Sequence, residues 1–155
     1  MSDVKNQTQL LFPQFRELLT LVLEQVNHEI AGKTGFSNFV IVETYRSQLR
    51  QTELYNQGRS TPGAIVTWRR HSLHSDGVAA DLYPVMKGRI VTDVHSRDMG
   101  VFEFLRHAAH SHGVESGLDW NTPDAGHLQL SHNDRSLHYL DILHWSENLR
   151  NGTIK

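Results

Sequence analysis

Hydrophobic residues recur at intervals of three and four along two stretches of the chain, which is the spacing of one face of an α-helix. The first stretch runs from Leu11 to Ile30, with Pro13 near its start, where a missing amide hydrogen is tolerated. Its apolar face consists of Leu11, Phe15, Leu18, Val22, Val26 and Ile30. The second runs from an N-cap at Ser96 to about His112, with Gly113 as its stop. Its apolar face consists of Val101, Phe104, Leu105 and Ala108.

Three shorter segments have the character of β-strands. Residues 39–45 (FVIVETY) are rich in β-branched and aromatic side chains, and residues 78–85 alternate between apolar and other positions. In residues 127–130 the two leucines face one way, and the histidine and glutamine face the other. The first strand is therefore expected to end beside Arg46.

The remaining segments predict two more helices and a long loop. Ser47 is a suitable N-cap for a helix through Gln57, and Gly58 can adopt the left-handed conformation that closes it. Residues 58–71 have no sustained period, which is typical of a loop that lines a functional site. A final helix is predicted from Ser136 to about Leu149.

The order of these elements favours an α+β fold with an antiparallel sheet covered by helices on one face, because the βαβ spacing of a parallel sheet is missing. A chain of 155 residues without repeats or linkers is expected to form a single domain over residues 1–155.

The amino-acid composition limits the partners and the metal ligands that the chain can use. The net charge is −2 and there is no basic block, so nucleic acid is not an expected partner. The chain has no cysteine, which excludes disulfides, cysteine nucleophiles and thiolate metal sites. Any metal must be bound by carboxylates and by some of the eleven histidines.

The N-terminal residues show no secretory signal, and no apolar run approaches the roughly 20 residues that a membrane helix needs. We therefore expect synthesis in the cytoplasm and no membrane insertion. We also expect a monomer.

The segment 72–81 (SLHSDGVAAD) is the most informative for chemistry. His74 and Asp81 are seven residues apart and would lie on opposite faces of an unbroken strand. Gly77 can bend the chain between them, and Ala79 leaves room beside the carboxylate. Asp81 lies among apolar residues and needs a cation, which could be an arginine, a helix terminus or a metal.

A second constellation lies in residues 119–129. Pro123 and Gly126 indicate a turn, so Asp124 and His127 can point into one cavity from a bend that leads into a strand. His127 could be a metal ligand, although a histidine alone in such a position is more often structural.

The pattern Ser72-x-His74-x-x-Gly77-x-Ala79-x-Asp81 followed by Asp124-x-x-His127 resembles the metal signature of the LAS metallopeptidases, the group of D-alanyl-D-alanine peptidases and phage endolysins. Further motifs resemble the branch of L-alanyl-D-glutamate endopeptidases. They are Tyr45-Arg46-Ser47, Gln51, Glu53-Leu54-Tyr55, Gly58-Arg59, Pro62-Gly63 and Ile65-Val66-Thr67. Together these motifs cover roughly residues 40–130.

This resemblance implies a function for each site residue. His74, Asp81 and His127 would bind Zn²⁺, Asp124 would be the general base, and Arg46 would hold the substrate or stabilise the oxyanion. The chemistry agrees, because a catalytic zinc keeps three protein ligands and leaves its fourth position for water. An ion pair that only supports the structure is the alternative for Arg46.

The chain departs from its relatives at two places. Asp124 stands where carboxypeptidase and dipeptidase members typically have glutamate, which favours the endopeptidase branch. Residues 115–118 (ESGL) stand where relatives often show an aromatic residue followed by glycines, so the loop that faces the substrate is expected to differ.

The resemblance therefore implies a zinc-dependent peptidoglycan endopeptidase that hydrolyses the L-alanyl-D-glutamate bond of the stem peptide. We expect a phage endolysin without a separate cell-wall-binding domain, which reaches the wall through a membrane pore. The alternatives are a D-alanyl-D-alanine carboxypeptidase or dipeptidase, and a zinc-stabilised binding module without catalysis. Asp124 argues against the binding module, because a structural zinc needs no base.

The other histidines carry weaker signals. His107 and His110 are three apart on a predicted helix, but no third ligand accompanies them, so a solvated face is expected. His71 and His132 lie near the proposed ligands in sequence and could support them.

Overall fold

The computed structural model describes residues 7–93 and 99–155, and its centre is an antiparallel sheet with the strand order β1-β2-β5-β4. A short strand, β3, pairs with the far end of β2. The strands are β1 (Asn38–Glu43), β2 (Ala79–Met86), β3 (Arg89–Ile90), β4 (Val114–Ser116) and β5 (His127–Leu130). The predicted α+β class with an antiparallel sheet is thus confirmed.

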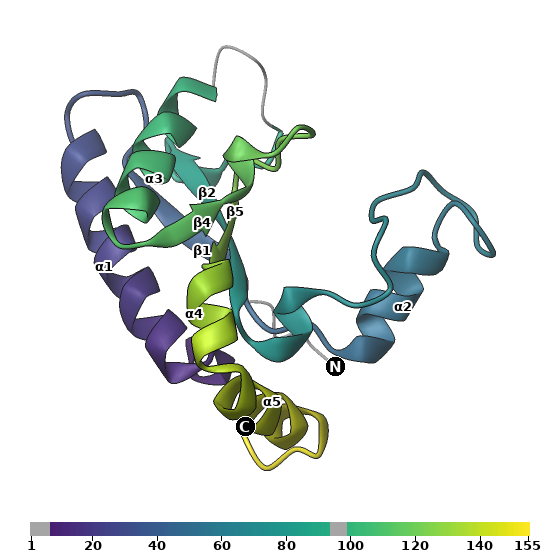
Figure 1. Ribbon diagram of the computed structural model, residues 1–155. Coiled ribbons are helices and arrows are strands. Elements are labelled where there is room, and N and C mark those ends of the chain that lie inside the picture. Colours follow the sequence, from purple (N-terminus) through teal and green to yellow (C-terminus); the bar gives the residue numbers. More distant parts are fainter. Residues whose placement is uncertain (1–6, 94–98) are drawn as a thin grey trace.

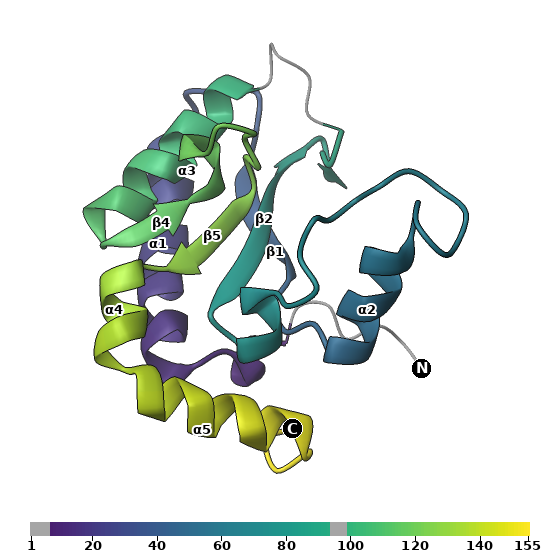
Figure 2. The ribbon, with the colours of Figure 1, turned by 45° about the vertical axis from the view of Figure 1, so that its right-hand side comes forward.

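Helices cover one face of this sheet and flank the other. The longer elements are α1 (Pro13–Ile30), α2 (Gln48–Asn56), α3 (Met99–Ser111), α4 (His132–Leu137) and α5 (Tyr139–Arg150). The single-turn elements are η1 (Thr8–Leu10), η2 (Leu73–Asp76) and η3 (Gly117–Asp119). In Figures 1 and 2, α1 and α3 pack together to the left of the sheet, whereas α2 stands apart on the right. The face of the sheet that looks toward α2 therefore remains accessible.

The core lies between the sheet and the helix pair α1 and α3. The buried face of α1 consists of Phe15, Leu19, Val22, Val26 and Ile30. Phe39 of β1 meets Phe102 of α3 edge to face, with ring centroids 5.6 Å apart. The sequence prediction was wrong at one residue in each helix, because Leu19 and Phe102 are buried whereas Leu18 and Phe104 are only partly so. The spacing Phe15, Leu19, Val22 follows the helical period more closely.

The predicted C-terminal helix is wrong in its extent. Two helices replace it, because Ser131 caps α4 by accepting a hydrogen bond from the amide of Asp134, and the chain turns at His138 before α5. No glycine or proline marks this turn in the sequence. Strands β3 and β4 were not predicted, since two or three residues are too short to show alternation.

The signals for helix ends were more accurate. Ser47 caps α2 by accepting from the amide of Arg50, and Gly58 and Gly113 adopt positive φ angles after α2 and α3. The predicted N-cap Ser96 lies outside the described residues.

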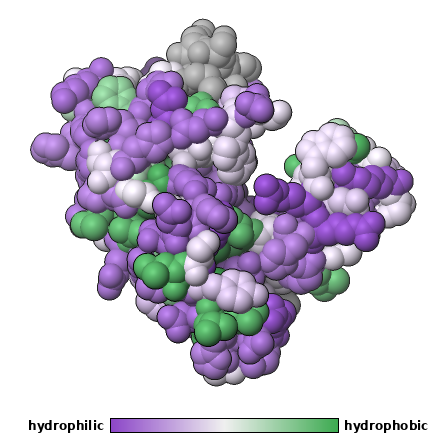
Figure 3. All heavy atoms as spheres, in the orientation of Figure 1, coloured by the Kyte–Doolittle hydropathy of each residue, from purple (hydrophilic) through white to green (hydrophobic). Residues whose placement is uncertain are grey.

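None of the helices in the part of the chain that the structure describes is long and apolar enough to cross a membrane. Figure 3 shows hydrophobic side chains gathered over α4 and α5 on the viewed face, where Leu137, Leu140 and Leu143 are exposed.

Candidate metal centre

Three predicted ligands converge at the accessible face of the sheet. Asp81 of β2 and His127 of β5 are directly paired across the two strands, and His74 comes from η2, immediately before β2. One donor atom from each of the three residues lies within 4.8 Å of the other two. The sequence therefore placed this cluster correctly.

Gly77 supplies the bend that brings His74 to Asp81. Its φ angle is 73°, in the left-handed region that favours glycine. A Cβ atom at this position would lie only 2.7 Å from the carbonyl oxygen of Leu10. Both the backbone conformation and the close approach therefore require glycine, as the sequence pattern predicted.

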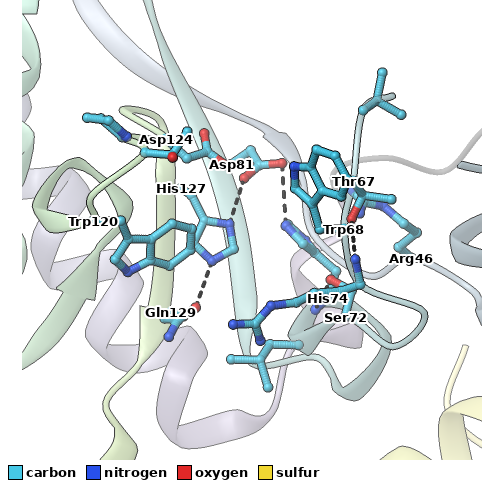
Figure 4. Close-up of a pocket in the computed structure, with 15 residues that line it drawn as sticks. Arg46, Thr67, Trp68, Ser72, His74, Asp81, Trp120, Asp124, His127 and Gln129 are labelled. Atoms are coloured by element: carbon cyan, nitrogen blue, oxygen red, sulfur yellow. Dashed lines mark hydrogen bonds and ion pairs between the residues drawn. The ribbon is translucent and has the colours of Figure 1, made fainter. Parts of the chain in front are cut away.

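The donor atoms of the three side chains lie close enough together to share one metal ion. Asp81 Oδ1 lies 3.2 Å from His127 Nδ1, and Asp81 Oδ2 lies 3.4 Å from His74 Nε2 (Figure 4). The three side chains are thus arranged as a metal-binding triad.

Each imidazole is oriented by a second hydrogen bond on its other nitrogen. His74 Nδ1 donates to the backbone carbonyl of Thr44 at 2.7 Å, which leaves Nε2 free to face Asp81. His127 Nε2 lies 2.9 Å from Gln129 Oε1, which leaves Nδ1 to face the carboxylate. The sequence analysis missed both partners. The alternation that places Gln129 on the face of His127 could have indicated it, but nothing in the sequence marks a carbonyl such as that of Thr44.

The electrostatics of the triad keep its carboxylate ionised. Burial alone would raise the pKa of Asp81, but hydrogen bonds from His127 and His74 and the positive charge of these rings hold it well below its usual range. Burial alone would lower the pKa of His127, yet the hydrogen bond and the charge of Asp81 raise it. Asp81 therefore carries the negative charge that a metal ligand needs.

Asp124 lies at the rim of the same pocket, in the loop that leads into β5. Its amide donates to the carbonyl of Gly117 at 2.9 Å, and its carbonyl accepts from the amide of His127 at 3.1 Å. Although Asp124 is exposed, desolvation by neighbouring protein atoms raises the pKa of its carboxyl group, and the charge of Asp81 adds to this rise. This carboxyl group is therefore a better proton acceptor than an ordinary aspartate.

Gly117 allows the Asp124 loop to pack against the sheet, and the sequence analysis did not identify it. A Cβ atom at Gly117 would overlap the carbonyl oxygen of Asp124 and lie 3.1 Å from the Cβ atoms of both Asp124 and His127. Only glycine fits at this close approach.

We expect Gly117→Ala to lower the free energy of unfolding by about 1–3 kcal/mol, because the added methyl group must displace the Asp124 backbone. Urea denaturation of the purified variant measures this change. Gly100→Ala is the matched control, since a Cβ atom at Gly100 in α3 meets nothing within 4 Å. Equal stability of the two variants would contradict this packing argument.

Arg46 contacts both the pocket and a structural ion pair. Its Nε lies 2.5 Å from Glu43 Oε1, its Nη1 donates to Gln51 Oε1 at 2.9 Å, and its amide donates to the carbonyl of His74 at 3.1 Å. The ion pair considered as an alternative is therefore present, and the guanidinium also lines the pocket.

The loop of residues 58–71 forms one wall of the pocket, and α2 holds it there. Gln51 donates to the carbonyl of Arg69 at 2.6 Å, and Gln48 donates to that of Arg70 at 2.7 Å. The pocket has a volume of about 580 Å³ and Figure 3 shows the surface hollowed between α2 and the sheet. Trp68 of this loop and Trp120 lie on opposite sides of the triad in Figure 4. The loop thus lines the site, as predicted.

The other histidines considered in the sequence analysis, His71, His107, His110 and His132, lie apart from the triad. His71 Nε2 lies 2.8 Å from Asp76 Oδ2, and the imidazole of His132 is exposed, so neither touches a metal-binding side chain in the described structure. His107 and His110 are exposed, as expected, and His110 lies 2.6 Å from Asp119.

Comparisons with known proteins agree with this geometry. A family model described as D-alanyl-D-alanine carboxypeptidase matches residues 66–130, which include all three triad residues and Asp124. The peptidoglycan L-alanyl-D-glutamate endopeptidase CwlK of Bacillus subtilis (strain 168) is 37% identical over 99 residues. The match to CwlK covers 59% of this chain and 59% of that protein. The chain is thus similar to LAS-type metallopeptidases over the segment that contains the triad.

Two crystal structures share the fold of this chain. The L-Ala D-Glu endopeptidase ChiX of Serratia marcescens matches 82% of this chain and 85% of its own, with 24% identity and a TM-score of 0.59. The vancomycin resistance D,D-dipeptidase VanXYg, in complex with a D-Ala-D-Ala phosphinate analog, matches 88% of this chain and 58% of its own. Its identity is 18% and its TM-score is 0.52.

Proposed function

We propose that the protein is a zinc-dependent peptidoglycan endopeptidase that hydrolyses the L-alanyl-D-glutamate bond of the stem peptide. The observation that carries this proposal is one pocket that contains the converging donors of His74, Asp81 and His127 together with Asp124. A site that only stabilises the fold needs a fourth protein ligand and no proton acceptor.

The donor set favours zinc. Two imidazoles and one carboxylate, without thiolates, are the ligands of many hydrolytic zinc sites, and three protein ligands leave one position for water. A zinc ion held there would lower the pKa of that water to about 7.

The protein's own groups would then carry the proton and the developing charge. Asp124 accepts the proton of the attacking water and delivers it to the nitrogen of the leaving amine, so one carboxylate serves both steps. Arg46 stays charged at any relevant pH, and Glu43 and Gln51 hold its guanidinium at the pocket. It would bind the oxyanion that forms on the scissile carbonyl, or a carboxylate of the substrate.

The choice of bond rests on similarity. The 37% identity to CwlK and the aspartate at position 124 support cleavage between L-Ala and D-Glu. The description of the matching family model favours a second candidate, a D-alanyl-D-alanine carboxypeptidase.

Digestion of defined peptidoglycan separates the two candidates. We expect mass spectrometry to find fragments with new D-glutamate amino termini and, in the same sample, one equivalent of zinc per chain. Release of free D-alanine instead would overturn the proposed bond, and an active protein without bound metal would overturn the whole assignment.

The endolysin setting is part of the same proposal. A single catalytic domain over residues 1–155, acting as a monomer, would be made in the host cytoplasm and would reach the wall through a membrane pore. The resemblance of its metal motifs to phage endolysins supports this setting. Expression inside a bacterial host should cause lysis only when a pore-forming protein is made as well.

A further inference from the structure

A chain of polar contacts leads from the triad to a carboxylate on the neighbouring strand. His127 Nε2 lies 2.9 Å from Gln129 Oε1, and Gln129 Nε2 donates to Glu115 Oε2 at 2.7 Å. Gln129 and Glu115 are direct partners in the pairing of β4 with β5. Gln129 is 8% exposed, so it has little access to water as an alternative partner. Glu115 belongs to the segment in which this chain departs from its relatives.

The contacts have only one consistent direction. An ionised carboxylate has no hydrogen to donate, so Glu115 must accept from the amide nitrogen of Gln129. The amide oxygen of Gln129 then faces His127 and can only accept. His127 therefore carries a hydrogen on Nε2. Without a metal its Nδ1 also lies 3.2 Å from Asp81 Oδ1 and donates to it, and a metal ion that replaces that hydrogen would bind Nδ1.

We propose that Glu115 is a positioning residue that selects, through Gln129, the imidazole nitrogen that His127 presents to the metal. This inference rests on the proposed metal site. Glu115 touches neither the metal ligands nor the substrate pocket, and it acts only through the orientation of the Gln129 amide.

Glu115 itself is held by the start of α4. The amide of His132 donates to Glu115 Oε1 at 2.6 Å, and Arg135 Nη1 lies 3.6 Å from Oε2. Desolvation would raise the pKa of Glu115, but the bonds from His132 and Gln129 and the charge of Arg135 lower it. The carboxylate of Glu115 thus stays ionised, so it can only accept the hydrogen bond from Gln129.

The two histidine ligands are therefore controlled in different ways. A backbone carbonyl orients His74, and this acceptor cannot become a donor. A side-chain amide orients His127, and an amide can turn over and offer its NH₂ group instead. Only the second ligand depends on a distant residue.

The test replaces the carboxylate by the amide of the same size. In Glu115→Gln the residue at position 115 can donate as well as accept, so Gln129 no longer has one preferred orientation. We expect a 10- to 100-fold loss of Zn²⁺ affinity, measured by competition with a chromophoric chelator. The ¹⁵N shifts of the His127 ring in the zinc-loaded protein should change from a single tautomer, with the hydrogen on Nε2, to a mixture. Glu103→Gln, on the exposed face of α3, is the matched control. It should change neither the zinc affinity nor the ring shifts.

A double variant tests the direction itself. In Glu115→Gln/Gln129→Glu the amide donates to the carboxylate, and the carboxylate accepts from His127 Nε2, so we expect most of the lost affinity and the single tautomer to return. Rescue also excludes a general folding defect of Glu115→Gln. Unchanged zinc affinity and ring shifts in Glu115→Gln, or failure of the double variant to rescue, would overturn the inference. A wild-type protein that binds no zinc would instead overturn the proposed function.

Discussion

Removal of the metal with a chelator is expected to abolish peptidoglycan hydrolysis, and stoichiometric Zn²⁺ is expected to restore it. The physical reason is that His74, Asp81 and His127 can align a water molecule for attack only when a cation joins them. Turbidity of purified cell walls measures the activity, and metal analysis of the same sample measures the content. Full activity of the metal-free protein would contradict the proposed mechanism.

The same removal is expected to lower stability. A ligand that binds only the folded state stabilises it by about 4 kcal/mol when its concentration is 1,000 times its dissociation constant. For a chain of this length, that corresponds to a fall in Tm of about 8–16 °C. Differential scanning calorimetry with and without Zn²⁺ measures this shift.

A matched pair of histidine variants distinguishes the triad from nonspecific metal binding. His74→Ala removes a buried ligand and is expected to eliminate the zinc-dependent rise in Tm. His110→Ala removes an exposed histidine that also lies beside an aspartate, Asp119, and should leave the rise unchanged. An equal loss in both variants would place the metal elsewhere.

The convergence of the three triad side chains could be predicted from the sequence because its signals are local. His74, Gly77 and Asp81 lie within eight consecutive residues, and the bend at Gly77 depends on backbone sterics alone. His127 and Asp124 are likewise joined by one turn. Residues that meet through chain-local geometry leave a readable pattern.

The features that the sequence did not reveal depend on contacts between distant segments. Gly117 is needed because the Asp124 loop returns against it, and Thr44 contributes a carbonyl that any residue could provide. No glycine or proline marks the turn at His138 between α4 and α5, and β4 is only three residues long. Such features follow from how the elements pack, which local composition does not encode.

Asp124→Asn is expected to reduce kcat by a factor of about 10²–10⁴ while zinc remains bound. The amide has the size of the carboxylate but cannot accept a proton from water, and the backbone contacts of Asp124 with Gly117 and His127 do not involve the side chain. Initial rates on purified walls and metal analysis of the same preparation provide the measurement.

Asp119→Asn is the matched control for this substitution. It makes the same chemical change, from carboxylate to amide, five residues before Asp124. The side chain of Asp119, however, pairs with Arg106 and His110 on the outside of the molecule. We expect near wild-type kcat and full zinc content for this control. A zinc-loaded Asp124→Asn protein with undiminished kcat would show that another group takes the proton. A wild type that binds zinc and the wall but cleaves nothing would instead favour the binding module without catalysis.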